Sequence, residues 1–287
     1  MGLDDLSSGR KSLVDPEVKF IRGSVADKGL LCSIFKKYKP EYVFHFAAIP
    51  RVSFSIEFPL VTSNANIIGT VTLLEVCRDF KVKRLIFSSS SSIYGGAKKL
   101  PTKEAENPPR PISPYALQKY TAEQFCKMFS DFYDLDTVSL RYFNVYGPNQ
   151  YGDSAYATVI SAWLEGMYFP KRRKPFLEGD GRQSRDFCFV DDVVRANIFA
   201  MQAKKKLGGE AINIAAGSPA TVLEVKKLIE KTTGRTLEVQ KRPPRVGDVR
   251  HTHADLSKAR KLIGFKPAVH IEEGIQKTVR WFEGRKK

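Results

Sequence analysis

Residues 84–90 read Arg84-Leu85-Ile86-Phe87-Ser88-Ser89-Ser90, a short apolar run that ends in small hydroxyl residues. Such a run is typical of a parallel strand buried on both faces, whose carboxyl end opens onto the sheet edge where ligands bind. Apolar strand runs alternate with longer helical patterns along the chain, which predicts an α/β fold with a parallel sheet. Other strands are expected at residues 18–21, 42–46, 137–140 and 211–214, with helices at 28–38, 66–80 and 115–132.

A second stretch, residues 113–119, reads Ser-Pro-Tyr-Ala-Leu-Gln-Lys. Ser113 can cap a helix and Pro114 suits its first turn, so Tyr115 and Lys119 fall on one face, where an ammonium can touch a phenol. A nearby cation stabilises phenolate and makes the tyrosine a usable base. A chance pair on an amphipathic helix has the same spacing. The serine run favours a redox site instead, because Ser90 at the strand end is placed to reach a substrate hydroxyl beside Tyr115.

These residues, with motifs that occur in the same order, resemble the extended short-chain dehydrogenase/reductase superfamily, in its branch of nucleotide-sugar epimerases and dehydratases. The other matching motifs are His45-Phe46-Ala47-Ala48, Asn66-Ile67-Ile68-Gly69-Thr70 and the segments 141–148, 179–187 and 245–250. The resemblance implies a Rossmann-like doubly wound parallel sheet, incomplete at its N-terminus, with a smaller C-terminal substrate-binding subdomain. Residues 1–143 with 187–215 would bind NAD, and residues 144–186 with 216–287 would bind the substrate.

The resemblance also implies which side chains hold NAD. They are Asp4, Phe46, Ala47, Ala48, Asn66, Ser88, Tyr115, Lys119 and Tyr142. Asp4 would accept hydrogen bonds from the adenosine ribose, which favours NAD over NADP. An ordinary surface charge near a chain end explains Asp4 equally well.

Members of this superfamily begin with a strand, a glycine-rich turn and a helix that hold the pyrophosphate, and residues 1–287 contain no such segment. The first residues resemble the end of the family's second strand. In a sheet of order 3-2-1-4-5-6, loss of the central first strand leaves a gap of ~5 Å lined by unpaired backbone groups. We expect a start assigned too late or a degraded gene. Alternatives are a shift of strand 18–21 onto strand 42–46, or a strand donated by a partner.

The substrate residues come mainly from the later motifs. Asn144 offers an amide to a phosphate or uracil, and Arg185 and Arg245 offer guanidinium groups that suit a diphosphate. A single arginine is more commonly an exposed ion pair, but these lie inside ordered motifs. By resemblance, Phe176 stacks on the uracil and Asp248 binds the ribose hydroxyls. The expected set is Ser90, Asn144, Val159, Phe176, Arg185, Arg245, Asp248 and Thr252.

The reaction is inferred from the two residues after the strand-end serine. Related dehydratases and decarboxylases carry an acidic residue there, whereas this chain has Ser91 and Ser92. The resemblance therefore implies a 4-epimerase that oxidises C4, rotates the keto sugar and reduces it from the other face. Tyr115 would take the hydroxyl proton, Lys119 would lower its pKa and hold the nicotinamide ribose, Ser90 would share the hydrogen bond, and NAD would hold the hydride.

The sugar is inferred from Thr252, which stands where a bulky tyrosine narrows the pocket in epimerases restricted to UDP-glucose. A smaller residue leaves room for an N-acetyl group. We expect UDP-GlcNAc/UDP-GalNAc as substrates, with UDP-Glc/UDP-Gal as a second pair. The alternative is a truncated, catalytically impaired protein that binds a sugar nucleotide but holds NAD poorly. An NADP-dependent reductase is disfavoured by Asp4.

Composition sets the remaining expectations. A chain of 287 residues with 42% hydrophobic content can bury a large core. Four scattered cysteines favour a reducing cytoplasm. The net charge of +16 is spread over short clusters without a basic stripe, so we expect no nucleic-acid partner, although a positive field would attract a sugar nucleotide. The sequence shows no signal peptide or long apolar run, so we expect no membrane partner.

Two further expectations concern metals and assembly. His45, His251 and His253 lack carboxylate or cysteine partners at ligand spacing, so we expect no metal site. The helices at 66–80 and 115–132 have apolar faces, and the resemblance implies that this pair forms a homodimer interface. Packing onto their own sheet is the simpler interpretation, and both can hold because such helices have two sides.

Overall fold

The computed structural model describes residues 1–153, 157–244 and 249–285. The chain forms two compact units of nearly equal size. The first contains Met1–Gly95, Pro109–Arg141 and Asn197–Ile212, and the second contains Gly96–Pro108, Tyr142–Ala196 and Asn213–Lys287. The boundaries of these units differ from the expected ones.

Two segments account for most of the difference from the expected boundaries. The loop 96–108 belongs to the second unit because Thr102 forms a bridge with Ala254 and its N–H donates to the His253 carbonyl at 2.7 Å. Residues 187–196 join the same unit because β9 (Cys188–Phe189) pairs with β6 (Val145–Tyr146).

The first unit is built on a four-stranded sheet of order β10 (Glu210–Ile214), β5 (Thr137–Tyr142), β4 (Arg84–Ser90) and β3 (Tyr42–His45). The ends of β5 and β10 reach into the second unit. β3 and β4 are parallel, with Tyr42 opposite Arg84 and His45 opposite Phe87. β4 is almost entirely buried, as its apolar run predicts. The α/β class with a parallel sheet is confirmed.

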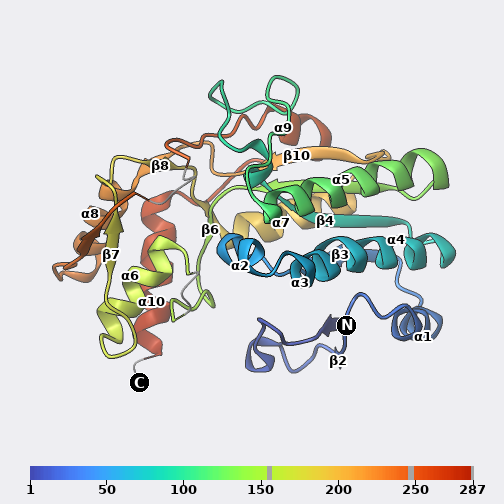
Figure 1. Cartoon of the computed structure of the whole chain (residues 1–287), viewed down its shortest axis with the longest axis horizontal. Coiled ribbons are helices and arrows are strands. Elements are labelled where there is room, and N and C mark those ends of the chain that lie inside the picture. Colours follow the sequence, from blue (N-terminus) through green and yellow to red (C-terminus); the bar gives the residue numbers. More distant parts are fainter. Residues whose placement is uncertain (154–156, 245–248, 286–287) are drawn as a thin grey trace. The chain divides into compact units, whose positions relative to one another are not determined.

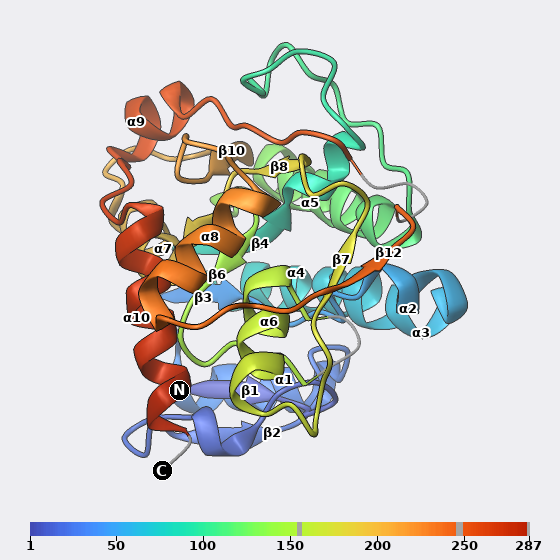
Figure 2. The ribbon, with the colours of Figure 1, turned by 90° about the vertical axis from the view of Figure 1, so that its left-hand side faces the viewer.

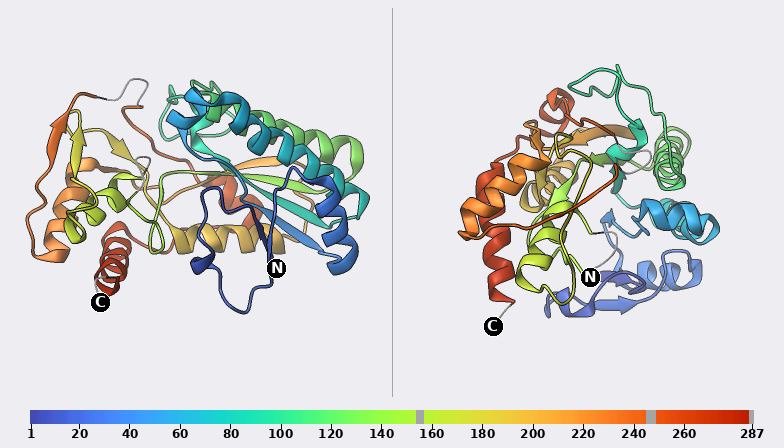
Figure 3. Two further views of the ribbon diagram at one scale, coloured as in Figure 1. Left: turned by 60° about the horizontal axis from the view of Figure 1, so that its bottom comes forward. Right: turned by 60° about the vertical axis from the view of Figure 1, so that its left-hand side comes forward.

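Helices α4 (Gly69–Asp79) and α5 (Pro114–Tyr133) pack against each other, and α5 packs on β4 (Figure 3). Ser113 caps α5 by accepting a hydrogen bond from the Ala116 N–H at 3.2 Å. Before α4 lie α2 (Val52–Glu57), α3 (Pro59–Ser63) and a π-helical turn, Asn64–Ile68. The short 3-10 helices are η1 (Lys11–Leu13) and η3 (Ser91–Tyr94).

Strands β1 (Gly2–Asp4) and β2 (Phe20–Arg22) form a separate parallel pair (Figure 1). The suggested shift of the second strand onto β3 is therefore wrong, because β2 pairs with β1. Helix α1 (Lys28–Tyr38) explains this placement, since it follows β2 closely and packs on α4. Leu3 and Ile21 pack against the same apolar cluster, so side-chain burial holds β1 and β2 in place.

The second unit combines short strand pairs with helices around its own core. β7 (Phe176–Glu178) pairs in parallel with β12 (Gln240–Arg242), and β8 (Ser184–Arg185) pairs antiparallel with β11 (Ala220–Thr221). The helices are α6 (Val159–Tyr168), α8 (Val222–Thr233), α9 (Ser257–Ile263) and α10 (Ile271–Gly284), and α7 (Val190–Gln202) crosses the boundary between the units. The core lies between α6, α8 and α10, which Figure 2 shows together.

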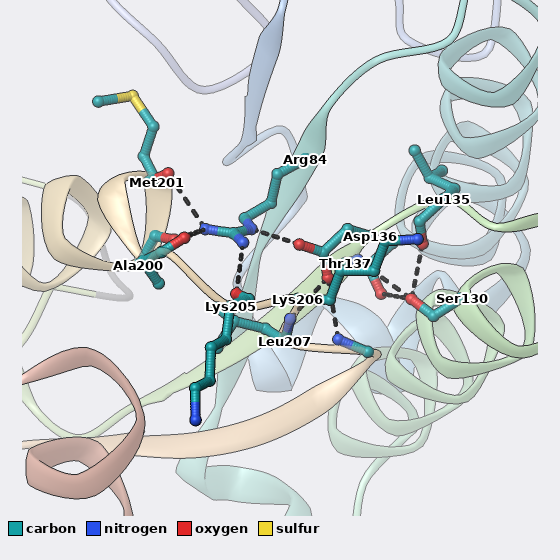
Figure 4. A network of polar contacts seen from close by, with 12 residues as sticks. Arg84, Ser130, Leu135, Asp136, Thr137, Ala200, Met201, Lys205, Lys206 and Leu207 are labelled. Carbon is teal, nitrogen blue, oxygen red and sulfur yellow. Dashed lines mark hydrogen bonds and ion pairs between the residues drawn. The ribbon is translucent and has the colours of Figure 1, made fainter.

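A buried ion pair fixes the start of β4. Arg84 Nε donates to Asp136 Oδ2 at 2.6 Å, and both side chains are almost fully buried. The remaining guanidinium hydrogens go to backbone carbonyls at the end of α7 and in the loop after it, as Figure 4 shows for Ala200, Met201 and Lys205. These bonds satisfy carbonyl groups that a helix end leaves without partners.

One helical stretch of the described chain, residues Pro59–Asp79, is long and apolar enough to cross a membrane by length and composition alone. The expected absence of a long apolar run concerned uninterrupted apolar residues, and Thr, Ser and Asn interrupt this helix. The core helix of a water-soluble protein passes the same test, and α4 contributes Leu73, Leu74 and Cys77 to the core of the first unit. The absence of a membrane partner stays a prediction.

Candidate active site

The carboxyl end of β4 and the first turns of α5 bring three predicted catalytic residues together in the first unit. The Ser90 hydroxyl lies close enough to the Tyr115 phenol to lower its pKa by hydrogen bonding. Lys119 Nζ donates to the Ser88 carbonyl at 2.7 Å and lies 4.8 Å from the centroid of the Phe87 ring. Tyr115 and Lys119 are both buried. The site is therefore a dry corner between a strand end and a helix start.

Burial controls the protonation of both groups on α5. It raises the pKa of Tyr115 to about 12, and the hydrogen bond with Ser90 lowers that pKa in partial compensation. Burial lowers the pKa of Lys119 to about 8. The spacing predicted that the Lys119 ammonium contacts the Tyr115 phenol. In the structure the ammonium instead donates to the Ser88 carbonyl. In this arrangement Ser90, rather than Lys119, lowers the pKa of the phenol.

A buried histidine lies next to this lysine. His45 Nε2 and Thr70 Oγ1 are hydrogen-bonded at 2.9 Å, and Thr70 in turn donates to the Asn66 carbonyl at 2.8 Å. Burial, followed by the charge of Lys119, lowers the pKa of His45 to about 3. The imidazole is therefore neutral at ordinary pH, so it places no second positive charge near the Lys119 ammonium.

Asn66 holds the turn after β3. Its Oδ1 accepts from the Ile49 N–H at 2.8 Å, and its Nδ2 donates to the Ile49 carbonyl at 3.3 Å and to Gln118 Oε1 at 2.8 Å. The amide is thus fully engaged within the protein, so its observed contacts fix the position of the turn that contains Ala47 and Ala48. The sequence prediction had this amide contacting the cofactor.

Sequence reasoning missed a second buried ion pair under the site. Glu123 on α5 receives Arg141 Nη2 on Oε1 at 2.5 Å and Arg141 Nε on Oε2 at 3.0 Å. Ser89 also donates to Glu123 Oε2 at 2.9 Å, and Arg141 donates to the Tyr94 hydroxyl at 2.7 Å. Glu123 stands one turn after Lys119 on the same helix face, and that spacing is the signal that was available.

The other predicted cofactor residues lie at strand ends. Asp4 ends β1, is exposed and accepts from the Leu6 N–H at 2.6 Å through Oδ1. Phe46 directly follows β3 and is more than half exposed, with its ring parallel to that of Phe44 at 6.3 Å. Tyr142 ends β5 and belongs to the second unit.

The predicted substrate residues other than Ser90 belong to the second unit. The Asn144 carbonyl accepts from the Cys188 N–H at 3.0 Å, and Val159 begins α6. Arg185 Nη1 donates to the carbonyls of Ser184 and Arg250 at 3.0 and 3.3 Å. Thr252 Oγ1 accepts from the Asp186 N–H at 3.1 Å. Arg245 and Asp248 lie outside the described residues.

Phe176, the residue expected to stack on uracil, lies between two arginines. The Arg242 guanidinium is 4.0 Å from the ring centroid and that of Arg173 is 5.4 Å from it. Burial, followed by the charge of Arg242, lowers the pKa of Arg173. Two cations on one ring favour an anionic or electron-rich ligand nearby. No sequence pattern indicated that Arg242 would reach this ring.

The described part of the chain contains no group of three or more histidine, cysteine, aspartate or glutamate residues that could hold a metal ion. The three histidines considered above have hydrogen-bond partners of their own. His251 Nδ1 bonds Ser184 Oγ at 2.9 Å, His253 Nε2 bonds the Gly217 carbonyl at 3.2 Å, and His45 bonds Thr70.

Residues 1–215 match the NAD dependent epimerase/dehydratase family. The chain belongs to this family. It is similar to the UDP-glucose 4-epimerase of Thermotoga maritima, solved with UDP-glucose, with 38% identity, a TM-score of 0.93 and coverage of 99% of this chain and 91% of that one. A UDP-N-acetylglucosamine 4-epimerase from Methanobrevibacter ruminantium, solved with UDP-N-acetylmuramic acid, is 36% identical, with a TM-score of 0.91 and coverage of 99% and 90%. A UDP-glucuronate 4-epimerase of Thermodesulfobacterium geofontis is 37% identical over 92% of this chain and 79% of its own.

Membership in this family makes the protein an NAD-dependent enzyme, and the residues of the first unit fit the nicotinamide end of that cofactor. Lys119 is buried and uses one of its three N–H groups on Ser88, so the others can bind ribose hydroxyls. The second carboxylate oxygen of Asp4 would accept from the adenosine ribose. The glycine-rich turn that holds the pyrophosphate in this family is not among residues 1–287.

Proposed function

We propose that the protein is an NAD-dependent 4-epimerase of UDP-sugars that accepts UDP-GlcNAc and UDP-GalNAc, with UDP-Glc and UDP-Gal as a second pair. The observation that carries the proposal is the buried corner where Ser90 bonds the Tyr115 phenol one helical turn from Lys119. The 4-epimerases of similar sequence and structure support the reaction type.

In this proposal Tyr115 accepts the proton of the sugar's 4-hydroxyl as C4 is oxidised, and returns it to the C4 oxygen when the rotated keto sugar is reduced on its opposite face. Ser90 holds the same hydroxyl and lowers the pKa of the phenol, while Lys119 binds the ribose next to the reacting carbon. NAD, when bound, supplies the hydride acceptor and donor at C4. The buried corner excludes water, which strengthens each of these polar contacts.

The choice of sugar rests on Thr252. Its hydroxyl accepts from the Asp186 N–H, so the side chain lies along the backbone of β8 and the residues after it. The similar proteins named above act on UDP-glucose, UDP-N-acetylglucosamine and UDP-glucuronate, so overall similarity alone leaves the sugar open. Thr252→Tyr is expected to lower the ratio of acetylated to plain substrate turnover, since the ring fills the space of an N-acetyl group. An unchanged ratio would refute this assignment.

The first experiment incubates the purified protein with UDP-GlcNAc, with and without added NAD, and follows UDP-GalNAc by proton NMR. Turnover supports the epimerase. Binding of UDP-GlcNAc without turnover at saturating NAD favours the alternative function, a sugar-nucleotide-binding protein that holds NAD poorly. The Tyr115→Phe variant is the control, because it keeps the fold and removes the base.

We also propose a cytoplasmic homodimer formed through α4 and α5. Apolar side chains on the outer faces of this helical pair are exposed, which suits a partner helix pair. They are Leu117, Met128 and Phe132 on α5, Ile68 in the π-helical turn that leads into α4, and Leu60 and Val61 on α3. Light scattering of the wild-type protein and of Phe132→Glu tests the interface, and a wild-type monomer at micromolar concentration would refute it.

A further inference from the structure

Gln118 stands between Tyr115 and Lys119 in the sequence, yet its side chain serves neither of them. It is 3% exposed, and its partners are 52 or more residues away along the chain. Nε2 donates to Thr62 Oγ1 at 2.8 Å and to Ser63 Oγ at 3.0 Å, while Oε1 accepts from Asn66 Nδ2 at 2.8 Å. The amide therefore ties α5 to α3 and to the π-helical turn before α4.

The chain of bonds continues to the turn after β3. The Asn66 side chain is 2% exposed. It accepts a hydrogen bond from the Ile49 N–H and donates one to the Ile49 carbonyl. The distance from the Ile49 nitrogen to Asn66 Oδ1 is 2.8 Å. Gln118 is thus two side-chain bonds away from the backbone of the turn 46–50, which contains Phe46, Ala47 and Ala48, the residues that the family resemblance assigns to the cofactor. A π-helical turn at this point is typical of a functional position.

We propose that Gln118 is a positioning residue that fixes the turn 46–50 relative to Tyr115 and Lys119. The role rests on the proposed function, because that function gives those two residues their task. The geometry favours positioning over simple packing, since each amide group of Gln118 is directed to a different element. A buried apolar side chain of similar length would fill the space, but it could not accept the hydrogen bond from Asn66, whose side chain holds the turn.

The test compares Gln118→Met with Ser130→Ala. Met keeps the length of glutamine and removes both ends of the bridge. Ser130 lies on the same helix, away from the site, where its hydroxyl donates to the Leu135 carbonyl at 2.7 Å. Ser130→Ala therefore removes a partly buried helix contact without touching the bridge. The readouts are hydrogen exchange of the Ile49 amide, NAD affinity, and kcat and KM for the UDP-sugar.

For Gln118→Met we expect faster exchange at Ile49 by about tenfold, as for loss of one buried hydrogen bond. We expect kcat to fall by about tenfold or more, because small misplacements of reacting groups are costly, with KM for the UDP-sugar unchanged. Ser130→Ala should lower the melting temperature and leave all three readouts unchanged. If Gln118→Met does not fold, Gln118→Glu replaces it: this variant keeps an acceptor for Asn66, so its Ile49 exchange should lie between the wild type and a full loss.

Unchanged Ile49 exchange in a folded Gln118 variant would overturn the positioning role, as would a fall in kcat that simply follows the melting temperature in both variants. An inactive wild-type enzyme would count against the proposed function alone, because the exchange rates still decide the role of Gln118.

Discussion

Two parts of the first unit, both built from parallel strands, differ in what holds them. In the corner formed by β4 and α5, buried side chains such as Glu123, Arg141 and Gln118 bond across several elements. In the β1–β2 pair, the side-chain hydrogen bonds are local: Asp4 accepts from Leu6 and Asp5 from Ser7, both exposed. The proposed chemistry lies in the corner, where long-range bonds set the relative positions of the groups assigned to it.

The difference has a physical basis. A buried polar group must find partners, and partners on different elements restrict those elements to one arrangement. A partly buried pair of three-residue strands whose polar side chains are exposed meets no such demand, and apolar contacts hold it without fixing polar side-chain geometry. Substitutions of polar side chains in the corner should therefore change both stability and activity, whereas those of polar side chains in the β1–β2 pair should change little besides binding of the cofactor's ribose.

The largest expected effect comes from Arg141→Met. It leaves Glu123 buried with no cationic partner, which costs about 3–5 kcal/mol of unfolding free energy. It also frees Tyr94 and the strand end that carries Ser89, so kcat should fall as well. Denaturant unfolding and steady-state kinetics measure the two effects.

Arg84→Met is the matched control for Arg141→Met. Arg84 forms an equally buried ion pair at the opposite end of the sheet, so its loss should cost similar stability without a comparable fall in kcat. An equal fall in kcat in the two variants would contradict this comparison, because the distance of the ion pair from the site would then have no effect on activity.

The next effect concerns the pH dependence of stability through Lys119. Burial lowers its pKa from 10.5 to about 8, so the folded state binds fewer protons than the unfolded state between these values. The cost of burying this lysine is full below pH 8, shrinks as the pH rises and vanishes above the unfolded pKa. At 1.36 kcal/mol per unit, this is about 3 kcal/mol.

Lys119→Met should therefore gain stability relative to the wild type at pH 7, and this difference should shrink steadily toward pH 10. Denaturant unfolding of both proteins across this range measures it. Parallel stability curves would contradict the lowered pKa. Loss of the hydrogen bond from Lys119 to the Ser88 carbonyl makes the gain in stability at pH 7 smaller than about 3 kcal/mol. The way this gain changes with pH does not depend on that bond.

A smaller kinetic effect is expected from Ser90→Ala. Because Ser90 lowers the pKa of Tyr115, its loss should raise that pKa further and move the rising limb of the kcat–pH profile, which reports deprotonation of this base, to higher pH. We expect kcat at neutral pH to fall about 100-fold, as for other lost active-site donors. Ser89→Ala is the neighbouring control: its hydroxyl bonds Glu123, so it should lose stability without moving the pH profile.

The sequence predicted the parts of this fold that local patterns determine. The helix expected at 28–38 is Lys28–Tyr38, and the apolar run before the serines is β4. Periodicity and the capping Ser113 also placed Tyr115 and Lys119 on one helix face. The structure adds that the Ser88 carbonyl, rather than the phenol, receives the ammonium, a competition between partners that spacing alone does not decide.

The sequence alone could not predict the contacts between segments that are far apart along the chain. Gln118 meets Asn66, and Arg242 meets Phe176, only because the chain folds back over many residues. The boundary of the second unit was missed for the same reason, since loop 96–108 follows its bonds to His253 and Ala254. Motif order revealed the family, but motifs carry no information on which non-motif side chain bridges them.

The smallest expected effect on stability is that of Asp4→Asn in the β1–β2 pair. The amide oxygen can still accept from the Leu6 N–H, so the unfolding free energy should change by less than about 0.5 kcal/mol. If Asp4 binds the adenosine ribose, the same variant should weaken NAD binding and narrow the preference for NAD over NADP, because a carboxylate repels the 2′-phosphate. Calorimetry with each cofactor measures this. A stability loss as large as that of Arg141→Met would show that the β1–β2 pair depends on buried polar contacts like the corner, and an unchanged cofactor preference would leave Asp4 as an ordinary surface charge.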